Sequence, residues 1–332
     1  MREGYEMANV LLIGMGPTAL AALESLAEKF HVVGVVRDTD DAVNSVDPVV
    51  ARAQELAIQV FSDISQAAIE RLVSCLKPDC VVVSSYNRIL KPKLIAQYPF
   101  VNVHYAPLPR YRGRANVNWA LINNEPCAAI TIHQITPDLD AGNILFQRLI
   151  PISNTDNVGD LYEKLNALQR KHLADTIARF LDKYEGIPQR SEEARYCCSR
   201  VPADGEIDWT ASSRKIDCLV RALAAPFPGA HTYFQGRRLI IWKAEPVEAP
   251  PCYVGRVPGR VVGISKSGGY VDVLAGDGIL RISRVQFEGE DSTSAAHVLR
   301  SVRSTLGLRT ADLLERIQVL EEQVAKLMGN RR

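Results

Sequence analysis

The segment Phe100-Val-Asn-Val-His104, followed by Tyr-Ala-Pro-Leu-Pro-Arg-Tyr-Arg-Gly-Arg114, is the stretch on which the interpretation of this chain depends. Its first five residues form a short, mostly apolar run before a proline-rich turn, a pattern that predicts a strand followed by a loop. Asn102 and His104 are two residues apart, so on a strand their side chains point to the same face. We therefore expect an amide and an imidazole side by side at a strand end.

A third polar residue, Asp140, lies in the later turn Leu139-Asp-Ala-Gly142. We expect this turn to bring the carboxylate of Asp140 close to the imidazole of His104. We prefer Asp140 to Asp138 because the small residues that follow it allow close backbone approach. An amide, an imidazole and a carboxylate suit acyl transfer without a covalent intermediate. His133 lies inside a predicted strand without a partner motif, and we interpret it as structural.

Apolar runs and amphipathic segments alternate over the first half of the chain. Strands are expected at 9–14, 31–36, 60–61, 80–84, 101–104, 129–134 and 144–150, and helices at 17–30, 48–57, 67–76 and 154–184. This alternation predicts an α/β fold with an open, mostly parallel, Rossmann-like sheet. Ligands of such sheets bind beyond the carboxyl ends of the strands. Asn87, His104 and Asp140 each follow a predicted strand, so we expect them at one edge.

The second half of the chain has a different pattern of residues, with short apolar runs separated by turns. The polar stretch 186–198 is expected to be a linker. Strand candidates at 230–234, 239–244, 259–264, 270–274 and 279–285 alternate with glycine-rich turns, which predicts a small OB-like β-barrel. We therefore expect a catalytic domain at 8–190, a barrel at 200–303 and a terminal coiled-coil helix at 306–330.

The terminal helix is expected to join two chains into a homodimer. An apolar residue recurs in it with heptad spacing, at Leu306, Leu313, Ile317, Leu320, Val324 and Leu327. Such a stripe is typical of a coiled coil. A helix packed on its own barrel is the alternative.

Composition narrows the function classes. The chain has 332 residues, is 47% hydrophobic and carries a formal net charge of +1, which is ordinary for a globular protein and does not favour a polyanionic partner. No apolar run approaches the ~20 residues of a membrane helix. The seven cysteines show no paired spacing, which favours reduced thiols in the cytoplasm. No His/Cys cluster has metal-ligand spacing, so we expect no metal.

A glycine motif, Gly14-Met-Gly16-Pro-Thr-Ala19, follows the first predicted strand. It resembles a dinucleotide-binding fingerprint, and Asp38 and Asp40 stand where a ribose-binding acid is usual. A glycine turn that opens a helix is common in any α/β sheet, and Pro17 suits the first helical turn. We prefer this second interpretation.

Three elements, Asn102-Val-His104, Leu-Pro-Arg-Tyr-Arg-Gly at 108–113 and Leu-Asp-Ala-Gly at 139–142, occur together in this order. In them the chain resembles the formyltransferases that use 10-formyltetrahydrofolate, and the resemblance extends over about residues 9–290. It implies a formyltransferase fold, the two-domain layout of methionyl-tRNA formyltransferase, and 10-formyltetrahydrofolate as cosubstrate.

Within that family the chain is most similar to the aminoarabinose-type, sugar-nucleotide N-formyltransferases, above all at residues 111–125. The short acidic segment 37–47 stands where the tRNA enzymes carry a long basic insertion. The resemblance thus implies a nucleotide-linked amino sugar as acceptor and no nucleic acid partner. Initiator tRNA or another small amine is the alternative acceptor, and a binding protein or formyl-folate hydrolase that keeps the fold is a further class.

The resemblance also implies roles for individual residues. Asn102 and His104 would stabilise the developing oxyanion, His104 would move the proton, and Asp140 would orient His104. Residues expected at the folate are Tyr86, Asn87, Arg88, Arg114, Thr136, Pro137, Asp138 and Leu139; residues expected at the sugar nucleotide are Arg110, Arg112, Asn118 and Trp119. Tyr105-Ala-Pro107 replaces smaller residues beside His104 and is expected to reshape the amine pocket.

Overall fold

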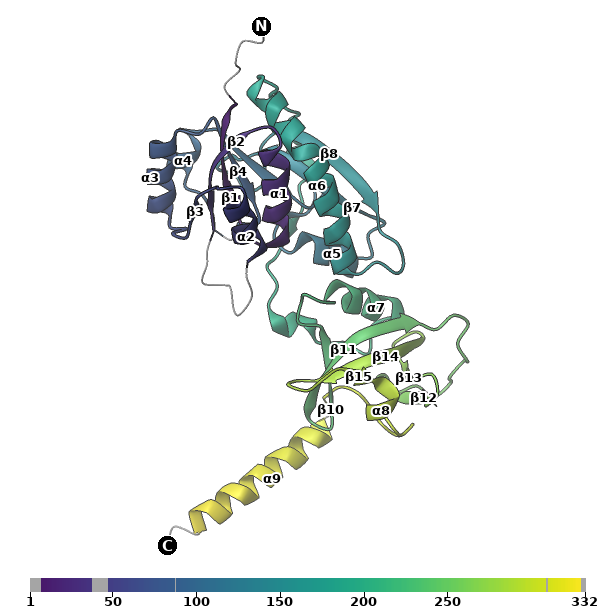
Figure 1. Cartoon of the computed structure of the whole chain (residues 1–332). Coiled ribbons are helices and arrows are strands. Elements are labelled where there is room, and N and C mark those ends of the chain that lie inside the picture. Colours follow the sequence, from purple (N-terminus) through teal and green to yellow (C-terminus); the bar gives the residue numbers. More distant parts are fainter. Residues whose placement is uncertain (1–6, 38–46, 87, 309, 330–332) are drawn as a thin grey trace. The chain divides into compact units, whose positions relative to one another are not determined.

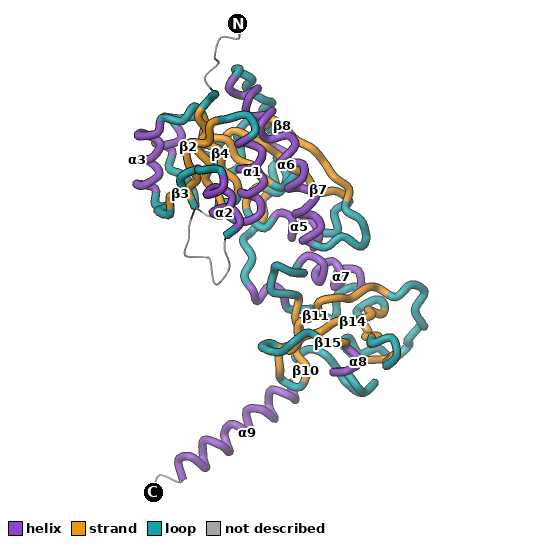
Figure 2. The backbone as a smooth tube through the Cα atoms, in the orientation of Figure 1, coloured by secondary structure: helices purple, strands orange, loops and turns teal. Residues whose placement is uncertain are grey.

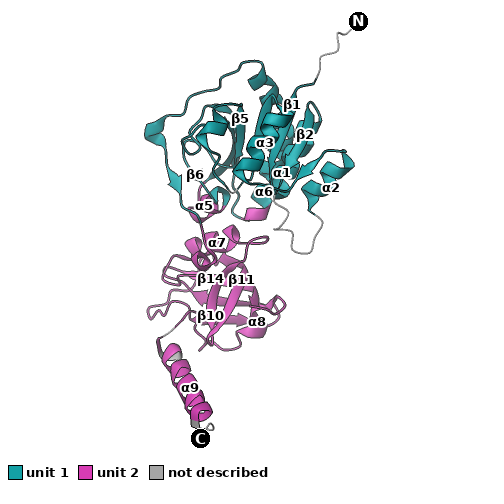
Figure 3. Ribbon diagram, turned by 90° about the vertical axis from the view of Figure 1, so that its left-hand side faces the viewer, with its two compact units in different colours: residues 1–117, 126–154, 160–199 teal, residues 118–125, 155–159, 200–332 magenta. Residues whose placement is uncertain are grey.

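The computed structural model describes residues 7–37, 47–86, 88–308 and 310–329. The chain divides into two compact units (Figure 3). The first unit comprises residues 1–117, 126–154 and 160–199, and the second comprises residues 118–125, 155–159 and 200–332. The short segments 118–125 and 155–159 therefore belong to the second unit, although they lie within the sequence range of the first.

The described part of the first unit is built on a 7-stranded sheet in the order β3-β2-β1-β4-β5-β7-β8 (Figure 1). Its strands are β1 (Asn9–Gly14), β2 (His31–Val36), β3 (Val60–Phe61), β4 (Cys80–Ser84), β5 (Phe100–His104), β7 (Cys127–Gln134) and β8 (Ile144–Pro151). The strands from β3 to β5 pair in parallel, whereas β7 runs antiparallel to β5 and β8 antiparallel to β7. The predicted α/β class with a mostly parallel sheet is confirmed.

Helices cover both faces of this sheet (Figures 1 and 2). They are α1 (Gly16–Ala27), α2 (Pro48–Glu55), α3 (Gln66–Leu76), α4 (Pro92–Ile95) and α6 (Val158–Leu181). Helix α5 (Asn116–Ile122) belongs mostly to the second unit. On one face α1 and α6 lie together, where Gln169 Nε2 donates to the Thr18 carbonyl at 3.1 Å. On the other face Ile69 and Leu94, from α3 and α4, pack in one apolar cluster with β-strand residues that include Phe100.

The two glycines of the β1–α1 turn are explained by backbone geometry. A Cβ on Gly14 would lie 1.9 Å from the carbonyl oxygen of Ser84 in the adjacent strand. Gly16 has φ +67°, a left-handed conformation that L side chains rarely adopt. The strand-to-helix connection therefore requires both residues. Asp38 and Asp40 lie outside the described residues.

The stretch 186–198 is part of the first unit, so the prediction of a linker there was wrong. Ile187 pairs with Ile144 at the start of β8. The short strand β9 (Tyr196–Cys197) pairs in parallel with β6 (Arg112–Gly113), and η1 (Ser191–Glu193) lies before it. These contacts are made mainly by backbone groups, which leave no periodic pattern of side chains in the sequence. The polar composition of the stretch therefore suggested a linker.

The second unit contains an antiparallel sheet in the order β10-β11-β14-β13-β12, with β15 on β14. Its elements are η2 (Pro202–Gly205), α7 (Ser213–Ala222), β10 (Ala230–Phe234), β11 (Arg237–Pro246), β12 (Val261–Ser265), β13 (Tyr270–Leu274), β14 (Ile279–Phe287), β15 (Thr293–Ser294), α8 (Ala295–Val298) and α9 (Thr310–Gly329). The backbone N–H of Val261 donates to Ser304, and that of Gly307 donates to Tyr233. Segment 304–307 thus hydrogen-bonds to both edge strands of the sheet, β12 and β10.

Trp209, 5% exposed, and Leu306, 3% exposed, belong to the apolar core of this sheet. The expectation that Leu306 belongs to the heptad stripe of the terminal helix was wrong, because α9 begins at Thr310 and Leu306 is buried in this core. Among the described residues, no helix has the length and apolarity that crossing a membrane requires.

Candidate functional site

Asn102 and His104 project from the face of β5 that also carries Phe100, since the three are spaced by two residues. Phe100 packs in the α3 cluster, whereas His104 lies two positions beyond Asn102 at the carboxyl end of the strand. His104 is 6% exposed and Asn102 is half-buried. The amide and the imidazole therefore share one face.

Asp140 reaches the imidazole from the β7–β8 loop. The carboxylate Oδ2 lies 3.8 Å from His104 Nδ1, and it accepts a hydrogen bond from the backbone N–H of Gly113 at 2.8 Å. The loop begins beside the start of β5, where the Ile135 N–H donates to the Phe100 carbonyl. Asp140 and His104 thus lie close together, as expected, although β7 is antiparallel to β5 and ends at the opposite edge of the sheet. The loop itself brings the carboxylate back.

His133, which was interpreted from the sequence as structural, lies between Asn102 and Asp140. It lies directly opposite Asn102 in the β5–β7 ladder, and directly opposed residues of antiparallel strands share a face. Its Nδ1 lies 2.7 Å from the Gln134 carbonyl oxygen, which requires a proton on Nδ1. Nε2 then carries a lone pair and accepts from Asn102 Nδ2 at 3.2 Å.

The electrostatic surroundings keep His133 neutral. Its pKa is lowered from the ordinary 6.5 to about 4, first by burial and then by the neighbouring His104, while Asp140 acts in the opposite direction. Its Nε2 lies 3.6 Å from Asp140 Oδ1. His133 could have been recognised only from its pairing with Asn102 across the β5–β7 ladder. The spacing of residues in the sequence does not predict which residues of two strands pair.

The Nε2 atom of His104 faces both an acceptor and a donor. The Tyr111 carbonyl oxygen lies 2.9 Å from it, and the Asn116 amide nitrogen lies 3.0 Å from it. A protonated Nε2 donates to Tyr111, and an unprotonated Nε2 accepts from Asn116. Both protonation states therefore have a hydrogen-bond partner, which suits a group that takes up and releases a proton.

Gln189 holds the turn that carries Asp140. Its Nε2 donates to the carbonyl oxygens of Asp140 and Gly142, each at 2.8 Å. Its Oε1 accepts from Arg112 Nη2 at 2.8 Å, and Arg112 Nη1 donates to the Tyr196 hydroxyl at 3.3 Å. Asp140 has φ +49°, a conformation that costs roughly 1–2 kcal/mol in a non-glycine residue. Gln189, which sequence inspection assigned to a linker, supports it.

The residues expected at the folate lie on two loops. Tyr86, half-buried, packs against the α3 cluster, its hydroxyl donates to the Ile64 carbonyl at 3.1 Å, and burial raises its pKa. Arg88 is exposed, and Asn87 lies outside the described residues. On the other loop, the Thr136 hydroxyl donates to the Asp138 carbonyl at 3.3 Å. Pro137, Asp138 and Leu139 are exposed.

The residues expected at the sugar nucleotide are divided between the two units. Arg110 is exposed, with its guanidinium carbon 5.6 Å from the ring centroid of Tyr111, whereas Arg112 is buried. Arg114, which was expected at the folate, is exposed. Asn118 and Trp119 belong to the second unit.

In the second unit, the Asn118 side chain is buried and donates to the Ala222 carbonyl at 2.7 Å. The Arg200 guanidinium lies 5.0 Å from the ring of Trp119. Each of these two side chains thus has a packing partner within the second unit.

Tyr105 does not line the Asn102–His104 face. It is the next residue after His104, and its hydroxyl oxygen lies 2.7 Å from Asn166 Oδ1 and 2.6 Å from Gln169 Oε1, within hydrogen-bond distance of both. Both belong to α6, on the opposite face of the sheet. Of the segment Tyr105-Ala-Pro107, which was expected to reshape the amine pocket, Tyr105 thus lies away from the Asn102–His104 face.

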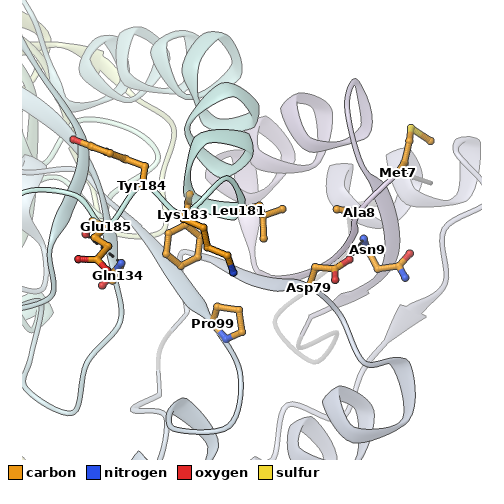
Figure 4. Close-up of a pocket in the computed structure, with 11 residues that line it drawn as sticks. Met7, Ala8, Asn9, Asp79, Pro99, Gln134, Leu181, Lys183, Tyr184 and Glu185 are labelled. Carbon is orange, nitrogen blue, oxygen red and sulfur yellow. Dashed lines mark hydrogen bonds between the residues drawn. The ribbon is translucent and has the colours of Figure 1, made fainter. Parts of the chain in front are cut away.

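A cavity of about 750 Å³ lies elsewhere in the first unit (Figure 4). Asn9, Asp79 and Pro99 line it from the amino ends of β1, β4 and β5, and Lys183 and Tyr184 line it from beyond the end of α6. Asp79 Oδ2 accepts from the Asn9 N–H at 2.7 Å. None of the residues predicted for the site lines this cavity.

Comparison with known proteins matches the chain to two family models. Residues 10–177 match the family described as formyl transferase, and residues 201–303 match its C-terminal domain. Methionyl-tRNA formyltransferase from Streptococcus thermophilus is 30% identical over 311 residues, which cover 90% of this chain and 97% of that protein.

Two solved structures share the fold. An N-formyltransferase from Helicobacter canadensis, in complex with folinic acid and dTDP-3-aminofucose, has a TM-score of 0.63 and 21% identity, covering 83% of this chain and 98% of that one. WlaRD, a sugar 3N-formyl transferase crystallised with dTDP and 5-N-formyl-THF, has a TM-score of 0.61 and 18% identity, covering 86% of this chain and 99% of that one.

Proposed function

This chain belongs to the formyl transferase family, and we propose that it moves a formyl group from 10-formyltetrahydrofolate to the amine of a nucleotide-linked amino sugar. The meeting of Asn102, His104 and Asp140 supports formyl transfer, since it gathers an oxyanion donor, a proton carrier and a carboxylate. This arrangement of the three side chains is the observation on which the proposal mainly rests.

Asn102 is the proposed oxyanion donor. One of its two amide N–H groups is directed at His133, which leaves the second for the oxygen of the formyl group. Because His133 accepts at Nε2, the NH2 end of the amide faces this side, and the carbonyl end does not. A preorganised donor of this kind contributes ~3–4 kcal/mol where single donors have been removed in other enzymes.

His104 is the proposed proton carrier. In the transfer, the acceptor nitrogen forms a bond to the formyl carbon, and the bond from that carbon to the folate nitrogen breaks. The proton lost by the amine passes through His104 to the folate nitrogen. Asp140, whose Oδ2 lies 3.8 Å from His104 Nδ1, orients the imidazole during the transfer.

The charge of the chain favours a small acceptor. The formal net charge is +1, and the segment 37–47 is acidic. Several arginines of the second unit already face acids: Arg237 pairs with Glu290, Arg238 with Glu288 and Arg281 with Asp272. Binding a polyanion depends on many unneutralised cations, so these pairs support a sugar nucleotide. For its pyrophosphate we infer Arg110 or Arg114, since both are exposed whereas Arg112 is buried.

Initiator methionyl-tRNA is the second candidate acceptor. The observation that favours it is the 30% identity to a methionyl-tRNA formyltransferase over nearly its whole length. The two acceptors make different demands, because tRNA binding weakens steeply with salt and binding of a sugar nucleotide does so far less.

The test is a formylation assay with 10-formyltetrahydrofolate and two sets of acceptors, which are dTDP- and UDP-linked amino sugars and charged initiator tRNA. A thermal-shift screen of the same nucleotides with folate present identifies the sugar to assay. We expect formyl transfer to an amino sugar and no salt-sensitive retention of tRNA. A higher kcat/KM for methionyl-tRNA than for every amino sugar tested would show that the acceptor is tRNA and would contradict the proposal.

A further inference from the structure

The helix α9 presents an uncovered apolar stripe. Every residue from Leu313 to Met328 is exposed. The stripe residues Leu313, Ile317, Leu320, Val324 and Leu327 are 46%, 50%, 43%, 53% and 69% exposed. Large apolar side chains gathered in a contiguous row mark an interaction surface. The helix has 20 residues and spans about 30 Å, since each residue adds about 1.5 Å.

The spacing and the residue types of this stripe define a heptad. The a positions hold Thr310, Ile317 and Val324, and the d positions hold Leu313, Leu320 and Leu327. All three a residues are β-branched and all three d residues are leucine. β-Branched residues at a with leucine at d favour a parallel, two-stranded coiled coil. The polar side chains Glu315, Gln318, Glu322 and Lys326 lie at the b, c and f positions, on the outer face.

Charge also fits a second copy of the chain. Arg316 occupies a g position and Glu321 the e position five residues later. In a parallel, in-register pair, g of one helix faces this e of the other, so a dimer contains two opposite-charge contacts. An antiparallel pair with full overlap sets Arg316 against Gln323 and Glu321 against Leu314. The ion pairs are then lost.

We propose that α9 forms a parallel, in-register, two-stranded coiled coil with α9 of a second copy of this chain. Ile317, Leu320 and Val324 form the centre of the interface, and Arg316 pairs across it with Glu321 of the other copy. Leu314 and Met328, both at e positions and exposed, widen the apolar seam against the stems of the g side chains. The pairing holds the Thr310 ends of the two helices together and joins two formyl transferase chains. It does not depend on which acceptor they use.

Light scattering of the full chain after size exclusion, over a range of concentrations, tests the oligomeric state. We expect twice the 36.7 kDa mass of the chain, and the single-chain mass for a variant that lacks the residues after 309 and for Ile317→Asp. Val319→Asp, on the outer face at a c position, is the matched control and should keep the dimer. A monomeric full chain, a trimer or tetramer, or a dimer that survives the deletion would overturn the proposal.

Charge reversal tests the pairing. Arg316→Glu places two acids opposite each other across the interface and should raise the dissociation constant about tenfold, and the added change Glu321→Arg should restore it. If the double variant is as weak as the single one, the proposed contact does not exist. Val324→Cys tests direction, since only a parallel, in-register pair sets the two sulfurs together. We expect an oxidised dimer beyond the amount that wild type forms under the same conditions, and its absence would contradict the parallel arrangement.

Discussion

His133 accepts a hydrogen bond from Asn102 across the β5–β7 ladder, with 3.2 Å between Nε2 and the amide nitrogen. The Nδ1–H of the same ring donates to the Gln134 carbonyl, so the ring has a defined tautomer. The tautomer fixes which end of the Asn102 amide faces the site. The proposed oxyanion donor is therefore oriented by a residue that takes no direct part in the chemistry.

Replacing His133 tests this orientation. His133→Leu removes the acceptor and frees the Asn102 amide to turn, so we expect kcat for formyl transfer to fall by about tenfold to a hundredfold, part of the value of an oxyanion donor. The affinity for folate should change little. His133→Gln supplies another acceptor and should recover most of the activity. A leucine variant with wild-type kcat would show that Asn102 needs no such partner.

The lowered pKa of His133 makes stability depend on pH. The pKa of His133 is about 4 in the folded chain, and its ordinary value is 6.5. Between pH 4 and pH 6.5, His133 is therefore protonated in the unfolded chain and neutral in the folded chain. The contribution of neutral His133 is complete above pH 6.5 and declines as the pH falls toward 4, by roughly 3 kcal/mol in all. Urea unfolding at several pH values should show this decline in wild type and a smaller one in His133→Gln.

His297→Gln is the control for that experiment, because His297 is exposed. Its free energy of unfolding should follow the wild-type pH profile. If His133→Gln and wild type lose stability in parallel from pH 6.5 to 4, burial of a neutral His133 is not the cause.

Gln189 should act on the rate through Asp140. Gln189→Ala removes two hydrogen bonds to the left-handed turn, so the carboxylate loses its fixed distance to His104. We expect kcat to fall by about tenfold or more while the KM for the acceptor changes little, as for other residues that orient a catalytic group. Gln189→Glu sets a carboxylate against two carbonyl oxygens and should be worse. Arg190→Ala, at the exposed neighbouring position, is the control. Equal rates in Gln189→Ala and Arg190→Ala would contradict the role.

The sequence predicted those parts of the molecule that depend on local pattern. The strands at 9–14, 31–36 and 80–84 and the shared face of Asn102 and His104 follow from apolar runs and a period of two. What it did not reveal depends on pairing between distant segments. The antiparallel register of β7 sets His133 beside Asn102, and the backbone pairing of 186–198 brings Gln189 to Asp140. Neither contact leaves a periodic trace in the sequence.

Tyr105 illustrates the opposite error. Its position next to His104 in the sequence suggested a pocket residue, yet Tyr105 follows the end of β5 and its hydroxyl contacts Asn166 and Gln169 of α6. Its side chain therefore lies away from the face that carries Asn102 and His104. Sequence neighbours at a strand end are therefore poorer candidates for a site than residues two positions away.

The most direct test of the account is the rate of formyl transfer by His104→Ala and by Asp140→Ala, measured with 10-formyltetrahydrofolate and the acceptor identified by the screen. Circular dichroism and folate affinity, measured on the same samples, report whether each variant is folded. We predict a loss of at least about a hundredfold in kcat for each variant, the low end of what a positioned acid–base group contributes, with folate binding retained. Turnover near the wild-type rate in either folded variant would contradict the assignment.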